Sequence, residues 1–309
     1  MGIKEFFEKP KEYAVVLCGG GGKGAYQVGV WGYLDEIGLT KNIKAISGCS
    51  IGALNSLLFA SGDIKRAIDI WEKADASLFT HKGDDRLSTD DSYEENTILK
   101  RLRAFISDPL TSMAPYSQEG IEDLIDTHME GRYDRLFDDD MMLYTSTSRV
   151  KVRGVLQENH HLPLAGHYEC LNGKTPEEIR EWTLASCAIP GAYPPRRIGE
   201  HLYYDGGATD NVPLRPLVWA RFKNIIIVHL RTADDPKEME RHITSFEGLD
   251  LRNVNIWEIY PSDPEVLGDT MELSYEKTLA RLAMGYNDAK RTLSVAPGFF
   301  GTRLLPPEA

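Results

Sequence analysis

The fold of this chain is decided by the stretch Tyr13-Ala14-Val15-Val16-Leu17-Cys18-Gly19-Gly20-Gly21-Gly22-Lys23-Gly24. Its first six residues form a short apolar run, which is typical of a strand that is buried on both faces. The glycines end that strand in a tight turn, and residues 24–37 then carry apolar side chains at helical spacing. A strand, a tight turn and a helix in this order predict the start of a parallel sheet with helical crossovers.

A second strand-to-helix unit follows directly. Lys44-Ala45-Ile46-Ser47 predicts another brief strand, and Leu54, Leu57 and Leu58 mark the helix after it. We expect Asp63 to cap a third helix, because an aspartate side chain accepts hydrogen bonds from the free N–H groups of a first helical turn. Two successive units of this kind indicate an α/β protein with a mainly parallel central sheet.

Further strands and helices are expected along the rest of the chain. Thr175 and Glu178 have the spacing of a capping box, with a proline in the first turn, and predict a helix that starts there. The last helix is expected over roughly 272–293, with these side chains facing inward: Leu279, Leu282, Ala283 and Tyr286. Apolar runs predict strands at residues 141–146, 150–156, 201–204, 225–228 and 254–259.

The pattern changes between residues 78 and 137. The first part of this segment is polar, acidic and rich in turn residues, and two amphipathic helices are expected after it, around residues 98–106 and 121–125. We expect a helical and loop insertion over the strand ends, which would form a cap. The chain is then a single α/β domain, residues 1–309, with the insertion of residues 78–137 inside it.

Composition and charge limit the class of protein. The 309 residues are 42% apolar and 27% charged, which is ordinary for a folded globular chain. The 47 acidic against 35 basic residues give a formal net charge of −12, which argues against nucleic acid as a partner, because phosphate backbones require a basic face. This charge opposes tight adhesion to anionic membranes but is compatible with transient contact with a membrane surface.

Targeting signals and cysteine usage favour a cytoplasmic protein. Charged residues interrupt the first twelve positions, where a signal peptide needs an apolar run. The four cysteines are not arranged in closely spaced pairs, so we expect reduced thiols.

The turn Gly48-Cys49-Ser50-Ile51-Gly52 carries the first candidate for chemistry. It has the pattern Gly-x-Ser-x-Gly between an expected strand and an expected helix. In such a turn the small flanking residues let the backbone fold back sharply, and the serine hydroxyl is exposed at a helix N-terminus whose dipole favours an alkoxide. Ser50 is therefore a candidate nucleophile, and the alternative is a glycine-rich packing turn.

The glycines of residues 19–24 carry the second candidate. Consecutive glycines allow several N–H groups to face one point, which makes an anion-binding nest. The loop fits the dinucleotide pattern through Gly19, Gly21 and Gly24, so a nucleotide-binding protein is the alternative function. That pattern also wants an acidic residue at the end of the second strand. Because this strand ends in the Ser50 turn instead, the glycines are better placed as an oxyanion hole.

The base that would activate Ser50 is the third question. The histidines are weak candidates, since His229 lies inside an expected buried strand and His201 opens another. By contrast, Asp205-Gly206-Gly207 follows a strand directly, and its glycines permit a tight turn that would aim the carboxylate at the same end of the sheet. Taken alone, Asp205 fits a catalytic role and an ordinary turn equally well.

Together these motifs resemble the patatin-like phospholipase family. The resemblance is carried by Gly19-Gly20-Gly21-x-Lys23-Gly24, Gly48-x-Ser50-x-Gly52 and Asp205-Gly206-Gly207, in this order. The neighbouring segments 185–195 and 210–213 also fit, and the likeness covers about residues 13–215. Two features depart from the family pattern: Cys18 stands where such proteins often have Asp or Ser, and the insertion of residues 78–137 has no counterpart that we can place.

The resemblance implies both a fold and an activity. It implies a three-layer α/β/α architecture and a lipid acyl hydrolase, of the phospholipase A or lysophospholipase type, that needs neither a metal nor a cofactor. It further implies a dyad in which Asp205 accepts the proton of Ser50, while backbone N–H groups of Gly20, Gly21 and Gly22 hold the oxyanion. The remaining motif residues would support these groups: Gly19, Lys23, Gly24, Gly48, Gly52, Gly206 and Gly207.

Overall fold

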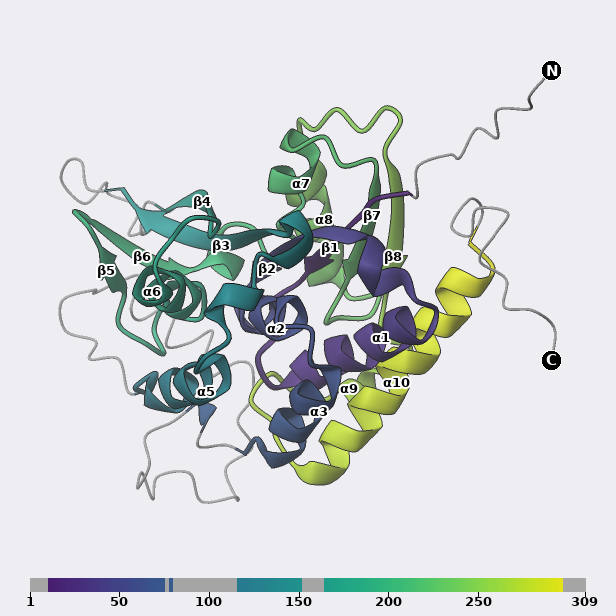
Figure 1. Ribbon diagram of the computed structural model, residues 1–309, viewed down its shortest axis with the longest axis horizontal. Helices are drawn as coiled ribbons and strands as arrows, with labels where there is room; N and C mark the ends of the chain where they lie inside the picture. Colours follow the sequence, from purple (N-terminus) through teal and green to yellow (C-terminus); the bar gives the residue numbers. More distant parts are fainter. Residues whose placement is uncertain (1–10, 76–77, 80–115, 152–163, 297–309) are drawn as a thin grey trace.

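The structure is a computed structural model that describes residues 11–75, 78–79, 116–151 and 164–296. Within these ranges eight strands form one sheet, in the order β5-β6-β3-β2-β1-β7-β8, with β4 paired to β3 (Figure 1). The strands are β1 Tyr13–Leu17, β2 Ile43–Cys49, β3 Met142–Val150, β4 Leu164–Cys170, β5 Arg196–Ile198, β6 His201–Asp205, β7 Asn224–Val228 and β8 Asn255–Ile259. Five neighbouring strands are parallel, namely β3, β2, β1, β7 and β8. At one end of the sheet, β4, β5 and β6 add antiparallel pairs.

Helices cover both faces of this sheet, which gives three layers (Figure 1). Alternate residues of β1 show why: Val15 and Leu17 pack into the cluster formed with α1, α2, α3 and α10, whereas Ala14 and Val16 pack into the cluster that includes residues of α7. The helices are α1 Ala25–Glu36, α2 Ile51–Ala60, α3 Ile64–Lys73, α5 Glu119–Met129, α6 Pro176–Ser186, α7 Arg215–Trp219, α8 Pro236–Phe246, α9 Pro264–Leu267 and α10 Tyr275–Ser294. The predicted α/β/α fold with a mainly parallel sheet is confirmed.

The pairing on β3 places two strand ends beside each other. β2 runs parallel to β3 and pairs its last residue, Cys49, with Ser146. β6 runs antiparallel to β3 and pairs its last residue, Asp205, with Thr147. Because β4 occupies the other edge of β3, β2 and β6 share one edge and run toward each other until their carboxyl ends meet. This register brings residues 50 and 205 together although 155 positions of sequence separate them.

Local signals placed most of these elements correctly. Asp63 caps α3 by accepting from the N–H of Arg66 at 3.0 Å. Thr175 and Glu178 form both hydrogen bonds of the predicted capping box at the start of α6. The strand expected at residues 150–156 is not seen as such: β3 continues to Val150, most of the expected segment lies outside the described residues, and β4 was not predicted.

The inward face predicted for the last helix is wrong in part. Leu279 and Ala283 are exposed, while Leu282 and Tyr286 are partly buried. The buried face of α10 instead carries two charged side chains, Arg281 and Asp288, together with smaller residues. This face of α10 points inward because the helix packs closely against α1 at Gly285. A Cβ on Gly285 would lie 2.0 Å from the carbonyl oxygen of Tyr26.

The described part of the insertion is held against α6. The predicted helix around residues 121–125 is present as α5, and its neighbour Gln118 donates to the carbonyl oxygen of Leu184 at 2.7 Å. The helix expected around residues 98–106 lies outside the described residues. A cap over the strand ends and a single domain therefore remain predictions. Within the described ranges, no helix combines the length and apolar character that crossing a bilayer requires.

Candidate active site

Ser50 lies on a sharp turn between β2 and α2. Its backbone has φ 54° and ψ −124°, a left-handed conformation that is uncommon for a residue with a side chain. The flanking glycines are required by close backbone contacts, since a Cβ on Gly48 would lie 2.4 Å from the Gly52 carbonyl oxygen and one on Gly52 would lie 2.1 Å from that of Leu17. The turn has the geometry that the Gly-x-Ser-x-Gly spacing predicts.

A second serine holds this turn in place. The backbone N–H of Ser50 donates to Oγ of Ser186 at 2.8 Å, and Ser186 donates in turn to the carbonyl oxygen of Ser146 at 2.7 Å. Ser186 is the last residue of α6 and Ser146 lies in β3, so three separate elements fix the backbone at residue 50. The serine side chain remains reachable, with Ser50 7% exposed.

Asp205 ends β6 and shares a pocket with Ser50. Its Oδ1 accepts from the N–H of Gly207 at 2.7 Å and from Sγ of Cys49 at 3.8 Å. Gly206 allows the chain to pass against β3, because a Cβ there would lie 2.5 Å from the carbonyl oxygen of Ser146. The Asp-Gly-Gly sequence therefore serves a tight turn that orients the carboxylate.

Burial changes the acidity of this carboxylate. Asp205 is 5% exposed, and removal from water raises its pKa to about 6. Three neighbours act in the opposite direction and lower this pKa: the nearby Ser50 hydroxyl, the Gly207 N–H, which donates to the carboxylate, and the positive charge of Arg241. At neutral pH the carboxylate is ionised, and it is a stronger base than an aspartate in water.

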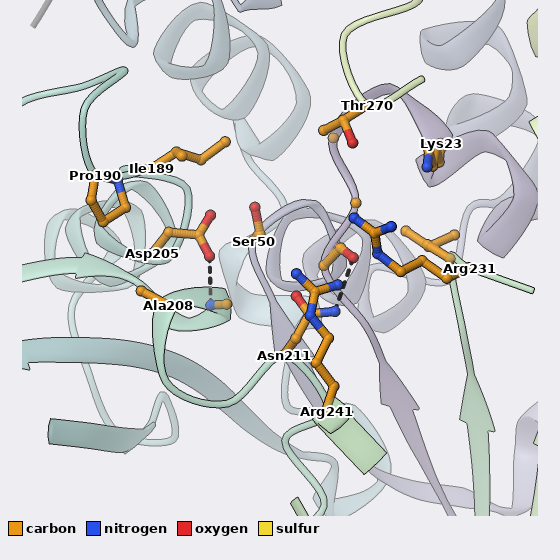
Figure 2. Close-up of a pocket in the computed structure, with 15 residues that line it drawn as sticks. Lys23, Ser50, Ile189, Pro190, Asp205, Ala208, Asn211, Arg231, Arg241 and Thr270 are labelled. Atoms are coloured by element: carbon orange, nitrogen blue, oxygen red, sulfur yellow. Dashed lines mark hydrogen bonds between the residues drawn. The ribbon is translucent and has the colours of Figure 1, made fainter. Parts of the chain in front are cut away.

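The pocket around these two residues has a volume of about 190 Å³. Figure 2 shows Ser50 between Asp205 on one side and the residues near the glycine loop on the other. The apolar lining of the pocket comes from Ile189, Pro190, Ala208 and Leu230. The remaining lining residues are Gly19, Gly20, Gly21, Lys23, Gly207, Asn211, Arg231, Arg241 and Thr270.

The glycine loop reaches this pocket with only part of its length. Gly20 and Gly21 line the pocket, and Gly21 has φ +57°, which favours glycine. Gly22 does not line it: its N–H donates to the carbonyl oxygen of Thr270 at 2.6 Å. The prediction that Gly22 contributes to an oxyanion hole is therefore wrong, because that donor already has a partner.

The other motif residues have packing roles around the site. A Cβ on Gly19 would lie 2.6 Å from Oδ1 of Asn211 and one on Gly24 would lie 2.4 Å from the ring of Trp71, so both positions admit only glycine without a shift. Lys23 is buried and its side chain lines the pocket.

No histidine lines the pocket among the described residues, and His160 and His161 lie outside them. His229 is buried, with Nδ1 2.5 Å from Glu238 and Nε2 3.0 Å from Glu258. Burial lowers the pKa of His229, but its contacts with Cys18 and the two glutamates outweigh burial and hold the pKa well above the usual value. A histidine that stays protonated cannot accept a proton from a serine.

Three pocket residues had not been assigned a role from the sequence. Asn211 donates from Nδ2 to the carbonyl oxygen of Gly19 at 3.2 Å and so ties the glycine loop to the turn after β6. Arg231 follows the end of β7, and its place after a central parallel strand could have indicated it, since ligands bind at such strand ends. Arg241 lies in the charged helix α8, and no sequence signal separates it from a solvent-facing residue.

A serine on a strained strand-to-helix turn, beside a carboxylate in a common pocket, is typical of α/β proteins with hydrolytic activity. Within that class the match is specific: the model of the patatin-like phospholipase family fits residues 15–218. The chain belongs to this family, which is a family of lipid ester hydrolases.

Individual relatives are distant. Lysophospholipase NTE1 of Cryptococcus neoformans var. neoformans serotype D is 25% identical over 228 residues, which cover 73% of this chain but 12% of that protein. The chain thus spans about an eighth of the length of the curated relative that it matches.

Among solved structures, human GIVD cytosolic phospholipase A2 is 9% identical with a TM-score of 0.49, over 91% of this chain and 58% of that one. VipD from Legionella pneumophila is 17% identical with a TM-score of 0.46, over 92% and 67% of the two chains. Because both scores lie below 0.5, the assignment depends on the family match and on the sheet topology.

Proposed function

We propose that this protein hydrolyses carboxylic esters of lipids, as a phospholipase A or lysophospholipase, with Ser50 as nucleophile and Asp205 as base. The observation that carries the proposal is the register on β3, where the ends of β2 and β6 meet at Ser146 and Thr147. A serine on a strained turn and a buried carboxylate then line the same pocket, which supports their pairing as nucleophile and base. A structural role alone would not require the two groups to share an open pocket.

In the first step Asp205 accepts the hydroxyl proton while Oγ of Ser50 bonds to the ester carbonyl carbon. The resulting oxyanion lies next to the backbone N–H groups of Gly20 and Gly21, which supply the hydrogen bonds that its negative charge requires. The carbon–oxygen bond to the alcohol then breaks, and Asp205 returns its proton to the departing alkoxide. The products of this step are the free alcohol and an acyl-serine.

In the second step a water molecule replaces the alcohol. Asp205, again ionised, takes a proton from water as its oxygen attacks the acyl carbonyl carbon. The bond to Oγ of Ser50 breaks, the carboxylic acid leaves, and the proton on Asp205 returns to the serine. One carboxylate of pKa about 6 thus acts as base and as acid in alternation.

The substrate is expected to reach the pocket from a lipid surface. Ile189, Pro190, Ala208 and Leu230 give the lining an apolar part that suits an acyl chain. Given the net charge of −12, contact with a membrane surface would be transient and local, and a cytoplasmic enzyme fits the cysteine usage.

Reaction with a fluorophosphonate probe tests the nucleophile. We expect the protein to be labelled at Ser50, and Ser50→Ala to lose both labelling and hydrolysis of a short p-nitrophenyl ester. Ser61→Ala is the matched control, because Ser61 is a buried serine at the end of α2 that donates to the carbonyl oxygen of Leu58. Hydrolysis that survives in Ser50→Ala would overturn the mechanism. Protection of the fold against heat by ATP or NAD, without labelling, would favour the nucleotide-binding alternative.

A further inference from the structure

A buried cluster of three potential metal ligands lies at the carboxyl ends of two neighbouring strands. Cys18 follows the end of β1, His229 follows the end of β7, and Glu238 lies in the first turn of α8. One donor atom from each of them lies within 4.8 Å of the donor atoms of the other two. Cys18 and His229 are completely buried, and Glu238 is 2% exposed. A thiol, an imidazole and a carboxylate from three separate segments therefore meet away from water.

The distances between these donors suit a small divalent ion. Sγ of Cys18 lies 3.9 Å from Nδ1 of His229, and Oε1 of Glu238 lies 2.5 Å from the same nitrogen. Bonds from zinc of about 2.3 Å to sulfur and about 2.0 Å to nitrogen or oxygen place tetrahedral donors roughly 3.3 to 3.6 Å apart. An ion between the three groups thus requires shifts of less than about 1 Å, in which the carboxylate moves away from the imidazole and the sulfur moves toward it.

Glu238 has a carboxylate oxygen without a hydrogen-bond partner. Its Oε1 contacts His229, but Oε2 is buried and no donor of the described residues lies within hydrogen-bond distance of it. The ion pair of Oε2 with Nη1 of Arg241 is 4.0 Å long, which is beyond that distance. A buried anionic oxygen without a donor is unfavourable, and coordination to a cation removes that cost. With both oxygens of Glu238 as ligands, the cluster offers four donor atoms: one sulfur, one nitrogen and two oxygens.

The other ring nitrogen of His229 is held as in metal-binding histidines. Nε2 lies 3.0 Å from Oε2 of Glu258, and the Tyr260 hydroxyl donates to the same oxygen at 2.7 Å. The rings of His229 and Tyr260 stack with their centroids 4.0 Å apart. A histidine that ligates a metal through one nitrogen usually donates through the other to a carboxylate, which fixes the orientation of the ring. Glu258 supplies that carboxylate and keeps Nδ1 directed at Cys18 and Glu238.

The ligand set selects the kind of ion. Thiolate and imidazole ligands suit zinc, whereas calcium and magnesium prefer ligand sets made of oxygen alone. An ion reaches the cluster from the side of Glu258, whose side chain is 27% exposed. Cys18, which supplies the sulfur, is also a position at which this sequence departs from the family pattern.

We propose that Cys18, His229 and Glu238 form a structural zinc site. On binding, the ion replaces two protons, one from the thiol and one from Nδ1 of His229, and both are released to water. The three ligands do not line the pocket of Ser50, so the ion stabilises the fold and takes no part in the reaction. It joins the strand end that precedes the glycine loop to α8. The site does not depend on the roles proposed for Ser50 and Asp205.

Zinc binding and thermal unfolding of the tag-free protein test this site. The protein is treated with a chelator, dialysed, and titrated with zinc chloride against a chromogenic competitor. We expect one zinc ion per chain, and a Tm that rises by about 5 °C when free zinc exceeds its dissociation constant about a hundredfold. Cobalt(II) in place of zinc should give the near-ultraviolet charge-transfer band of a cobalt–thiolate bond. Protein that binds no zinc, or that binds cobalt without this band, would overturn the proposal.

Cys18→Ser tests the sulfur ligand. A hydroxyl is close in size to a thiol but is a poor zinc ligand, so the zinc affinity should fall roughly ten- to a hundredfold and the cobalt–thiolate band should disappear. The matched control is Cys187→Ser, because Cys187 is another buried cysteine, directly after α6 and outside the cluster. Its zinc affinity and cobalt band should equal those of the wild type. Equal zinc affinity in Cys18→Ser and the wild type would place the ion elsewhere, and the proposal would be wrong.

Glu238→Gln covers the case in which Cys18→Ser does not fold. The amide keeps the shape of the side chain but removes the charge of one ligand, while Cys18 stays in place. The zinc affinity should therefore fall roughly tenfold, and the cobalt–thiolate band should remain. A zinc affinity unchanged by this substitution would count against the site as directly as a missing cobalt band in the wild type.

Discussion

Arg281 donates from Nη1 to the carbonyl oxygen of Gly22 at 2.9 Å, so the last described helix holds the first glycine loop. The guanidinium is fully buried and also donates to the carbonyl oxygens of Leu267 at 2.8 Å and Glu272 at 2.7 Å. Thr270 lies between Leu267 and Glu272 in the sequence, and its carbonyl oxygen accepts from the N–H of Gly22 at 2.6 Å. One buried cation thus ties the glycine loop to the segment before α10, next to the pocket of Ser50.

Replacing Arg281 with methionine should loosen this loop. Met has a similar length but leaves three buried carbonyl groups without a donor, and we expect a loss of about 3 kcal/mol in the free energy of unfolding. Because the loop carries Gly20 and Gly21, kcat for a p-nitrophenyl ester should fall as well. Urea unfolding and steady-state kinetics check both effects. Lys290→Met, on the exposed face of the same helix, is the control and should change the stability by less than about 0.5 kcal/mol.

Arg281 also shows where sequence reasoning fails. The apolar residues of the last helix suggested an inward face through Leu279 and Ala283, and that face is exposed. The true face depends on a partner 259 positions away along the chain, which no helical periodicity can reveal. A buried charge is favourable only when its partners are in place, and those partners are set by tertiary structure.

The candidate site was predictable where its geometry is local. The Ser50 turn and the Asp205 turn depend on glycines within two or three positions, and these are visible in the sequence. That both turns lie at the same end of the sheet was expected from the residues. The pairing of Ser50 with Asp205 depends on the register of β2 and β6 along β3, and it was implied only by the resemblance to a family. Gly22 was misjudged because the partner of its N–H is decided by packing against the distant Thr270. Arg241 was missed because packing against distant segments decides which face of its helix meets the pocket.

The pKa of Asp205 predicts how the activity depends on pH. Because the ionised carboxylate is the base, kcat/KM for a p-nitrophenyl ester should not depend on pH above about pH 6. Below that pH, kcat/KM should fall about tenfold for each decrease of one pH unit. In Arg241→Gln the fall of kcat/KM at acidic pH should begin at a higher pH, because Arg241 lowers the pKa of Asp205. If kcat/KM began to fall only below pH 5, the base would be a carboxylate in an ordinary environment.

The same pKa predicts that Asp205→Asn stabilises the fold. In the folded state the pKa is about 6 against 3.8 as the reference value, so the folded protein binds the proton more tightly and loses stability as pH rises from about 4 to 6. At about 1.4 kcal/mol for each tenfold change in proton affinity, ionised Asp205 costs roughly 3 kcal/mol at neutral pH. Asparagine carries no charge and avoids this cost.

Thermal unfolding of the wild type and Asp205→Asn across pH checks the effect. The variant should have the higher Tm at pH 7.5, and the two curves should converge near pH 4. Asp69→Asn, on the exposed face of α3, serves as a control with little change in Tm. Equal Tm values at both pH values would contradict a buried, ionised carboxylate.

Ser186 should position the nucleophile without touching the substrate. Ser186→Ala removes the acceptor of the Ser50 N–H and the donor to the carbonyl oxygen of Ser146. Since Ser50 holds a strained φ of 54°, loss of this support should lower kcat about tenfold and leave KM nearly unchanged. The rate of fluorophosphonate labelling should fall in parallel. A change in KM alone would place Ser186 in substrate binding.

Two glycine substitutions of equal size should have opposite effects on stability. In Gly52→Ala the new methyl group would lie 2.1 Å from the carbonyl oxygen of Leu17, so the Ser50 turn must shift, and we expect a loss of about 3 kcal/mol and of esterase activity. In Gly32→Ala, within α1, the nearest atom would lie 3.7 Å away, and removal of a flexible glycine should stabilise the helix by about 0.5–1 kcal/mol. Urea unfolding of both variants compares them directly, and a Gly52→Ala protein of wild-type stability would show that α2 does not start so close to β1.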